Sequence, residues 1–213
     1  LNWFFKDFIQ HLKKYFPITK GYLRKKIGEI KAVDDVNFNL LPGETLGLVG
    51  ESGCGKSTLG RVIAGILQPT LGSISIDGSP IVKNGRKITT RVQTVFQDPF
   101  ASLDPRMKVG GTISEGPIAH GLTTKEKSDD YVSNWFEKVG LDPVWLDRYP
   151  HQFSGGQRQR VAIARALAMQ PDVLICDEPV ASLDVSIQAQ IINLFLELTH
   201  ELKLTTIFIS HDL

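Results

Sequence analysis

The chain has 213 residues, of which 42% are hydrophobic and 22% charged, and its formal net charge is +1. This composition is typical of a globular protein, and the near-neutral charge gives no general attraction to nucleic acid or anionic membranes. No apolar run approaches the roughly 20 residues that span a bilayer, and there is no signal-peptide pattern. Two cysteines, Cys54 and Cys176, do not make a disulfide framework and fit a reducing cytoplasm. Both are expected to be small packing residues.

The first 28 residues contain two features, each with two interpretations. The apolar residues suit either an amphipathic helix or an edge strand over residues 8–16. They are Phe4, Phe5, Phe8, Ile9 and Leu12. A basic cluster follows, which indicates either a solvated loop, the interpretation that we favour, or a contact with lipid headgroups. Its members are Lys20, Arg24, Lys25 and Lys26.

A phosphate-binding loop follows the first clear strands. A half-buried strand is predicted at residues 36–40, where apolar and polar residues alternate, and a Pro-Gly turn leads into the apolar run 44–49, which predicts a buried strand. Residues 50–58 then read GESGCGKST, the complete pattern G-x-x-x-x-G-K-[ST]. Apolar residues come next at helical spacing, namely Leu59, Val62, Ile63 and Ile66. Strand, glycine-rich turn and helix form the context in which this motif binds phosphate.

The residue types in this loop suit a nucleoside triphosphate. Gly53 and Gly55 can adopt backbone angles closed to other residues, so that successive N–H groups converge on an anion. The helix that begins here adds the positive end of its dipole. Lys56 would reach the outer phosphates, and the Ser57 hydroxyl would bind Mg²⁺. We therefore predict contacts to the nucleotide from Gly50, Glu51, Ser52, Gly53, Cys54, Gly55, Lys56, Ser57 and Thr58.

Strands and helices alternate through the rest of the chain. Further strands are predicted at residues 73–77, 92–96, 173–177 and 206–210. This alternation indicates an α/β fold with a mainly parallel sheet. The last strand leads directly to the end of the sequence, so we expect a C-terminally truncated chain.

Helices are predicted between Phe96 and Val173, as a helical subdomain inserted into the sheet. One helix should begin with a capping box of Thr123 and Glu126 and stop at Gly140. Its apolar face consists of Val132, Trp135, Phe136 and Val139. A second helix is predicted at 154–169. After the strand at 173–177 comes a long amphipathic helix with Ile187, Ile191, Leu194, Leu198 and Leu202 on one face.

Two acidic residues stand where the strand at 173–177 ends. Asp177, after four apolar residues, is placed to hold Mg²⁺ directly or through water. Glu178 would orient or deprotonate an attacking water. A lone acidic pair after a strand is often only a helix cap, but a phosphate loop in the same chain favours catalysis.

A second set of motifs resembles the ATP-binding cassette (ABC) ATPases. The family's order is phosphate loop, Q-loop glutamine, signature, Walker B aspartate and glutamate, D-loop and switch histidine. The residues that follow this order after the phosphate loop are Gln97, Ser154, Gly155, Gly156, Gln157, Asp177, Glu178, Ser182, Leu183, Asp184 and His211. The resemblance covers the chain from roughly residue 8 to its end. The segments QDPFASLDPR, YPHQF and DVSIQ further resemble the ATPase subunits of bacterial oligopeptide and dipeptide importers, whose relatives also serve nickel and glutathione uptake.

The resemblance implies roles for these residues. The signature that begins at Ser154 would cap the γ-phosphate of ATP held by a second subunit, in a head-to-tail dimer. Ser154 and Gln157 also fit an ordinary capping box, and both roles can hold. Gln97 would offer an amide oxygen to Mg²⁺ or the water, and His211 would contact the γ-phosphate. Tyr15 is expected to stack on adenine, with Phe16 or Tyr22 as alternatives.

The implied fold is a P-loop NTPase core with an N-terminal antiparallel β subdomain, the ABC ATPase fold. Residues 1–98 would form that subdomain and the first part of the core, 99–170 the helical subdomain, and 171–213 the second part of the core. An iron–sulfur cluster, which the importer subunits often carry beyond this region, has no ligands within the sequence.

The resemblance implies an enzyme that hydrolyses ATP, with Mg²⁺, to drive an importer. Its partners would be a second ATPase subunit, transmembrane permease subunits and, indirectly, an external substrate-binding protein, at the cytoplasmic face of the membrane. One alternative is a soluble ABC-type ATPase acting on nucleic acid or ribosomes. It is disfavoured because only about a hundred residues, with no coiled-coil or zinc insertion, separate phosphate loop and signature. A non-catalytic regulator is disfavoured by Glu178 and His211.

Overall fold

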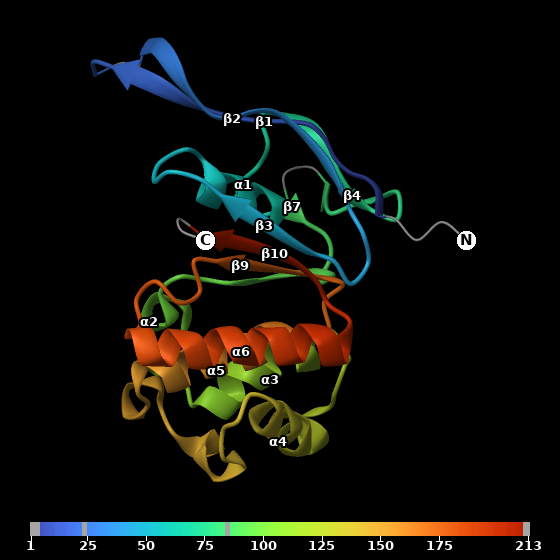
Figure 1. Cartoon of the computed structure of the whole chain (residues 1–213), viewed down its shortest axis with the longest axis vertical. Helices are drawn as coiled ribbons and strands as arrows, with labels where there is room; N and C mark the ends of the chain where they lie inside the picture. The colour runs from blue at the N-terminus through green and yellow to red at the C-terminus, as the bar shows by residue number, and fades with distance from the viewer. Residues whose placement is uncertain (1–4, 23–24, 84–85, 211–213) are drawn as a thin grey trace.

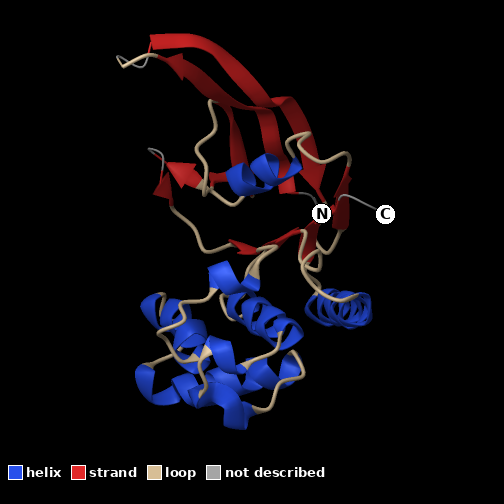
Figure 2. Ribbon diagram, turned by 90° about the vertical axis from the view of Figure 1, so that its left-hand side faces the viewer, coloured by secondary structure: helices blue, strands red, loops and turns tan. Residues whose placement is uncertain are grey.

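The computed structural model describes residues 5–22, 25–83 and 86–210. The chain is built in layers, with an antiparallel sheet at one end, a parallel sheet in the middle and a group of helices at the other end (Figures 1 and 2). The predicted α/β architecture is confirmed.

The parallel sheet has four strands in the order β3-β10-β9-β8. Every neighbouring pair is parallel, as predicted. The strands are β3 (Thr45–Val49), β8 (Val92–Val95), β9 (Val173–Asp177) and β10 (Thr205–Ser210). All residues of β9 are buried, because a central parallel strand has both faces covered.

β9 and β10 send alternate side chains into two separate cores, as the period of two in a strand requires. One core contains α1 and the antiparallel sheet, and it receives Val173, Ile175, Ile207 and Ile209. The other core contains the helices, and it receives Leu174, Cys176 and, partly buried, Phe208.

β3 differs from its prediction. The apolar run 44–49 predicted a buried strand, but every residue of β3 is exposed or half-buried. The reason is its position, since β3 lies at the edge of the sheet and pairs only with β10 in the described chain.

The antiparallel sheet settles the open question about the N-terminal residues. β1 (Phe5–Lys20) and β2 (Lys25–Leu40) form a long hairpin, whose far end projects beyond the body (Figure 1). The sheet order is β2-β1-β4-β5, so the strand interpretation is confirmed, although β1 is not an edge strand. Register shifts on both sides of Ile9 interrupt the alternation of buried and exposed residues along β1. Phe8, Ile9 and Leu12, whose spacing also suited a helix, are therefore all buried on this strand. The remaining strands are β4 (Leu71–Ile76), β5 (Ser79–Pro80), β6 (Val82–Lys83) and β7 (Arg86–Lys87).

The basic cluster lies at the far end of the hairpin, where Lys20 pairs with Lys25. Both are exposed, and Lys26 forms an ion pair with Glu29, with Nζ 2.7 Å from Oε2. Arg24 lies outside the described residues. The three described lysines lie on strand ends rather than in a long loop, and contact with lipid headgroups stays an untested alternative.

α1 (Lys56–Ile63) lies between the two sheets (Figure 1) and buries Leu59, Val62 and Ile63 as predicted. The prediction for Ile66 was wrong, because this residue lies beyond the helix and is exposed. The chain turns at Gly65, whose φ of 72° is the left-handed conformation that commonly ends helices.

The predicted helical insertion between β8 and β9 is observed. Its helices are α2 (Pro99–Ser102), α3 (Val109–Ala119), α4 (Ser128–Lys138) and α5 (Gly155–Leu167), with 3₁₀ turns at Lys125–Lys127, Pro143–Asp147 and Pro150–Gln152. The capping box of Thr123 and Glu126 was wrong. A box with Thr123 as N-cap would start the helix at residue 124, but α4 begins only at Ser128, because the 3₁₀ turn intervenes after Thr124.

α6 (Val185–Leu202) runs along the parallel sheet on the side of the helical insertion (Figure 1). Its predicted apolar face packs into the helical core, with Ile191, Leu194 and Leu198 buried. None of the helices in the described ranges is long and apolar enough to cross a membrane.

We expect the substitution Leu198→Ala to lower the free energy of unfolding by about 2–5 kcal/mol, because it leaves a cavity in the helical core. Leu198 is 2% exposed, whereas Leu196 on the same helix is 62% exposed. Leu196→Ala is therefore the matched control, with an expected change within about 0.5 kcal/mol. Urea unfolding measures both, and equal losses would contradict the assignment of the α6 face.

Candidate active site

The phosphate loop joins β3 to α1 and is shaped by two left-handed glycines. Gly53 has φ 81° and Gly55 has φ 101°, which confirms the predicted backbone angles. A Cβ atom at Gly55 would lie 2.1 Å from the carbonyl oxygen of Ala32 on β2. Glycine is therefore required at position 55 by both its conformation and the close approach of β2.

Lys56 folds back over this loop. Its Nζ donates hydrogen bonds to the carbonyl oxygens of Gly50 at 2.6 Å and Glu51 at 2.8 Å. These bonds hold a positive charge at a hollow of about 200 Å³ that is also lined by Gly55, Cys54 and Asp34. The charge lies where the sequence predicts phosphate binding.

The other loop residues form the outer wall and the first helical turn. Glu51 and Ser52 are exposed, whereas Ser57 and Thr58 are half-buried in α1. Cys54 is exposed, so its prediction as a packing residue was wrong, because the loop lies at the surface. Cys176 is buried as predicted, and burial raises the pKa of its thiol well above the usual range.

Asp177 ends β9 as a buried carboxylate with one oxygen, Oδ1, unsatisfied among the described residues. It is 5% exposed, and its Oδ1 has no hydrogen-bond donor within the described part of the chain. An unsatisfied buried carboxylate oxygen is costly, and a hard divalent cation such as Mg²⁺ would satisfy it. The residue thus fits the predicted metal role, which stays a prediction.

Glu178 is held in a strained conformation. Its φ is 48°, in the left-handed region that non-glycine residues rarely adopt, and its backbone N–H donates to Ile209 O at 3.1 Å. Such strain is typical of functional sites, where the surrounding structure holds it in place. Ile209 pairs with Asp177, and Ser210 pairs with Val49. The acidic pair and the phosphate loop therefore follow the carboxyl ends of strands in the same sheet, on the same side.

The signature residues open α5 with the capping box that the sequence suggested. Ser154 Oγ accepts from Gln157 N at 3.3 Å, and Gln157 Oε1 accepts from Ser154 N at 2.9 Å. A Cβ at Gly156 would lie 2.6 Å from Ile187 Cγ2, so the helix start packs tightly on α6. Gly155 lies beside Leu183 of the D-loop. The Ser154 hydroxyl is exposed, and its oxygen is the acceptor in this capping bond.

The segments after β8 and β9 are joined to each other. Val95 pairs with Cys176, so Gln97 and Glu178 leave neighbouring strands at the same end. Ser182 Oγ donates to the carbonyl oxygen of Gln97 at 3.1 Å. Asp184 is exposed at the start of α6, and its side chain makes no capping bond to the described helix.

Tyr15 lies on β1 beside the phosphate hollow. Its hydroxyl donates a hydrogen bond to Asp34, which lines that hollow together with Lys56. The sequence did not indicate Asp34, because its proximity to Tyr15 depends on strand pairing. Phe16 follows on the same strand, and Tyr22 is fully exposed in the hairpin turn. His211 lies outside the described residues.

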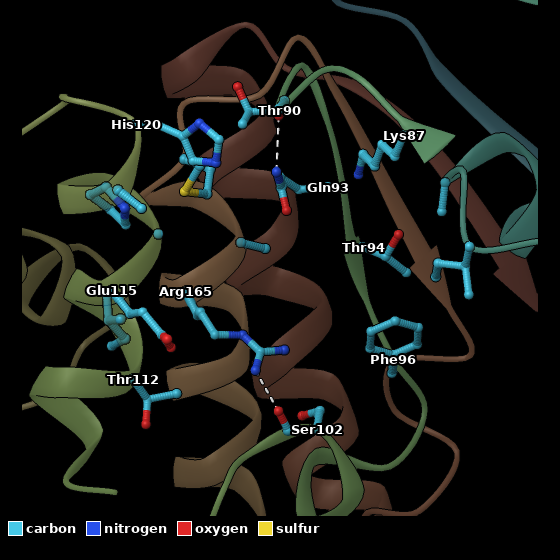
Figure 3. Close-up of a pocket in the computed structure, with 18 of the residues that line it drawn as sticks. Lys87, Thr90, Gln93, Thr94, Phe96, Ser102, Thr112, Glu115, His120 and Arg165 are labelled. Atoms are coloured by element: carbon cyan, nitrogen blue, oxygen red, sulfur yellow. Dashed lines mark hydrogen bonds between the residues drawn. The ribbon is translucent and has the colours of Figure 1, made fainter. Parts of the chain in front are cut away.

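A larger groove of about 970 Å³ lies elsewhere, between α3, α5 and β8 (Figure 3). Thr112 and Glu115 of α3 and Arg165 of α5 line one side, and Lys87 and Thr94 the other (Figure 3). Arg165 donates to the carbonyl oxygen of Ser102, and burial lowers its pKa. No lining residue of the groove belongs to the phosphate loop, so the groove is spatially separate from the phosphate hollow.

Comparison with known proteins agrees with the motif order. The family described as ABC transporter matches residues 33–181. The oligopeptide transport ATP-binding protein AppF of Bacillus subtilis is 50% identical over 96% of this chain and 64% of its own length. The dipeptide transport ATP-binding protein DppF of Haemophilus influenzae is 48% identical over 95% of this chain and 63% of its own. The glutathione import ATP-binding protein GsiA of Pectobacterium atrosepticum is 49% identical over 96% of this chain and 34% of its own length. The chain therefore spans less than two thirds of these relatives.

Two solved structures share the fold. CbiO1 of Clostridium perfringens, part of the ABC transporter complex cbiONQ, matches with a TM-score of 0.76 and 33% identity over 97% of this chain and 80% of its own. A dimeric bacterial ABC transporter cassette, MJ0796, matches with a TM-score of 0.78 and 27% identity over 96% of this chain and 87% of its own.

We expect Lys56→Ala to weaken the binding of Mg-ATP by at least about ten-fold, because a charged hydrogen-bond donor to phosphate is lost. Calorimetry measures the affinity. Lys127→Ala, at an exposed lysine of the helical insertion, is the control and should bind as the unmodified chain does. Unchanged affinity in Lys56→Ala would contradict the phosphate-loop assignment.

Proposed function

The chain belongs to the ABC transporter family of ATP-binding proteins, and on that premise we propose that it hydrolyses ATP to drive an importer of oligopeptides or dipeptides. The observation that carries the proposal is that Lys56, Asp177 with its unsatisfied Oδ1, and the strained Glu178 all lie at the carboxyl end of the parallel strands. Two relatives at 48–50% identity are named as oligopeptide and dipeptide transport proteins. A glutathione import relative supports a second candidate substrate, itself a short peptide.

In this proposal different residues of the chain bind the nucleotide, hold the metal ion and activate the attacking water. Lys56 and the loop N–H groups bind the β- and γ-phosphates, and Tyr15 stacks on the adenine. Ser57, Asp177 and Gln97 hold Mg²⁺, which when bound neutralises charge on the phosphate oxygens. Glu178 orients the water and accepts its proton. His211 contacts the γ-phosphate.

We further propose that the nucleotide site is completed by a second ATPase subunit. The phosphate hollow of about 200 Å³ is smaller than the roughly 300–1,000 Å³ of a typical ligand pocket. The signature helix α5 and helix α1 lie on opposite sides of the parallel sheet (Figure 1). The signature of a chain therefore does not face the phosphate loop of the same chain. A head-to-tail dimer would bring Ser154, Gly155, Gly156, Gln157 and Asp184 of one subunit to the nucleotide of the other.

We propose the groove of Figure 3 as the surface that meets the transmembrane permease. In this proposal residues 101–118 face the membrane partner, and they contribute Ser102, Asp104, Thr112 and Glu115 to the lining of the groove. The hydrogen bond between Ser182 and Gln97 joins the D-loop to the segment that leads into the groove. The chain would thus lie at the cytoplasmic face of the membrane as a peripheral subunit, with the substrate chosen by the permease and an external binding protein. The proposal also keeps the three parts of the chain named above: residues 1–98 as the β subdomain with the first part of the core, 99–170 as the helical subdomain, and 171–213 as the second part of the core.

We expect Glu178→Gln to keep ATP binding but to reduce hydrolysis by about 100-fold or more, because the general base is lost. Phosphate release measures turnover, and gel filtration with ATP should detect a trapped dimer. Glu197→Gln, at an exposed position of α6, is the control. Turnover of Glu178→Gln at the level of the control would show that another group activates the water.

We expect cysteines placed at Asp104 and Glu115 to crosslink to the permease in an assembled transporter. Cys54 is exposed and is first replaced by alanine, whereas Cys176 is buried and can stay. Asp129→Cys on α4 lies outside the groove lining and is the control. Crosslinking from position 129 alone would contradict the proposed docking surface.

A further inference from the structure

We propose that Asp34 and Lys31 position the ring of Tyr15, so that recognition of the nucleotide base depends on the tyrosine hydroxyl as well as on the aromatic ring. The inference rests on the proposed function, in which Tyr15 stacks on adenine. It assigns positioning roles to two residues of β2 that the motifs of the chain do not indicate.

The three side chains form a closed set of contacts. Tyr15 and Lys31 are paired directly across the hairpin. Lys31 Nζ lies 5.3 Å from the centroid of the Tyr15 ring, a cation–π distance. Lys31 Nζ also donates to Asp34 Oδ2 at 3.3 Å, and the Tyr15 hydroxyl donates to Asp34 Oδ1. Both oxygens of one carboxylate thus hold the ring tip and the cation over the ring.

The backbone of Tyr15 is fixed as well. Its N–H donates to Thr70 Oγ1 at 2.9 Å, beside the register shift between Lys14 and Tyr15. A half-buried tyrosine on a strand can otherwise rotate about its side-chain bonds. With the backbone, the hydroxyl and one ring face held, a single orientation is favoured, and in this proposal the base stacks on the ring face opposite Lys31.

The same segment of β2 also touches the phosphate loop. The carbonyl oxygen of Ala32 approaches Gly55 so closely that no Cβ would fit, and Asp34 lines the hollow with Lys56. Residues 32–34 therefore set the position of Tyr15 relative to the phosphate site. A base stacked on the ring would be placed at a set distance from phosphates bound by the loop.

The protonation states keep this hydrogen bond intact near neutral pH. The bond to Asp34 raises the pKa of Tyr15 to about 12, so the hydroxyl remains a donor. The same bond, followed by the contact with Lys31, lowers the pKa of Asp34, so the carboxylate remains an ionised acceptor.

Tyr15→Phe tests the proposal, because it keeps the aromatic face and removes only the hydroxyl. An aromatic that merely stacks would tolerate this change, since phenylalanine has the same ring. We expect the affinity for ATP to fall about 3- to 10-fold, while the affinity for inorganic tripolyphosphate, which has no base, stays unchanged. Calorimetry with both probes measures the difference.

Two further variants sharpen the test. Asp34→Ala should reproduce the loss, and the double variant Tyr15→Phe/Asp34→Ala should lose no more than either alone, as expected for two residues acting through one bond. Tyr131→Phe is the matched control, because it also removes a tyrosine hydroxyl bond, to Ala168 O at 2.6 Å, but in the helical insertion. It should bind both probes as the unmodified chain does.

The outcomes separate this inference from the proposed function. Wild-type ATP affinity in Tyr15→Phe, together with a loss in Tyr15→Ala, would overturn the positioning role and leave the stacking role. Wild-type ATP affinity in Tyr15→Ala would overturn both. An equal loss for tripolyphosphate in Tyr15→Phe would also overturn the inference, because it would mark damage to the phosphate loop. Failure of Lys56→Ala to weaken tripolyphosphate binding would instead contradict the phosphate-loop assignment alone.

Discussion

The structure depends on two central strands, β9 and β10, that are covered on both faces. Their alternate side chains serve two cores, one shared with α1 and the antiparallel sheet, the other with the helical insertion and α6. Because the strands are parallel and in register, their carboxyl ends lie together along one side of the sheet, its carboxyl edge. That edge carries Asp177 and Glu178, and it adjoins the phosphate loop that follows β3. Packing of the two cores therefore fixes the relative positions of the residues proposed to hydrolyse ATP.

A second constraint links the phosphate loop to the long hairpin. Gly55 lies against the carbonyl oxygen of Ala32, a contact that no other residue type at position 55 could make. β2 continues from there to Asp34, which is bonded to Tyr15. One short segment of β2 thus contacts the region proposed to bind the phosphates and the side chain proposed to bind the base. This continuity supports the proposed role of Asp34 and Lys31 in recognition of the base.

The arrangement leaves each chain with half of a proposed site. The phosphate loop and the signature both lie at helix starts, which are suited to bind anions, but these helices lie on opposite sides of the sheet (Figure 1). A second subunit would supply the missing half, and the bond between Ser182 and Gln97 offers a physical link from that interface toward the groove of Figure 3. In this proposal, closure of the dimer and movement of the permease would act on the same short segments after β8 and β9.

The sequence by itself determined the features that depend on residues close together in the chain. The phosphate loop, the capping box of Ser154 and Gln157, the buried strand at Val173–Asp177 and the amphipathic α6 all follow from local spacing, and all are observed. Only the tertiary structure decided the rest. It made β3 an edge strand, turned the N-terminal residues into a strand rather than a helix, and replaced the expected capping box before α4 with a 3₁₀ turn. It also brought Asp34 and Lys31 to Tyr15, and left Asp177 buried with an unsatisfied oxygen. These outcomes depend on which strand pairs with which and on what covers each face, and the spacing of residues along one segment carries no information about either.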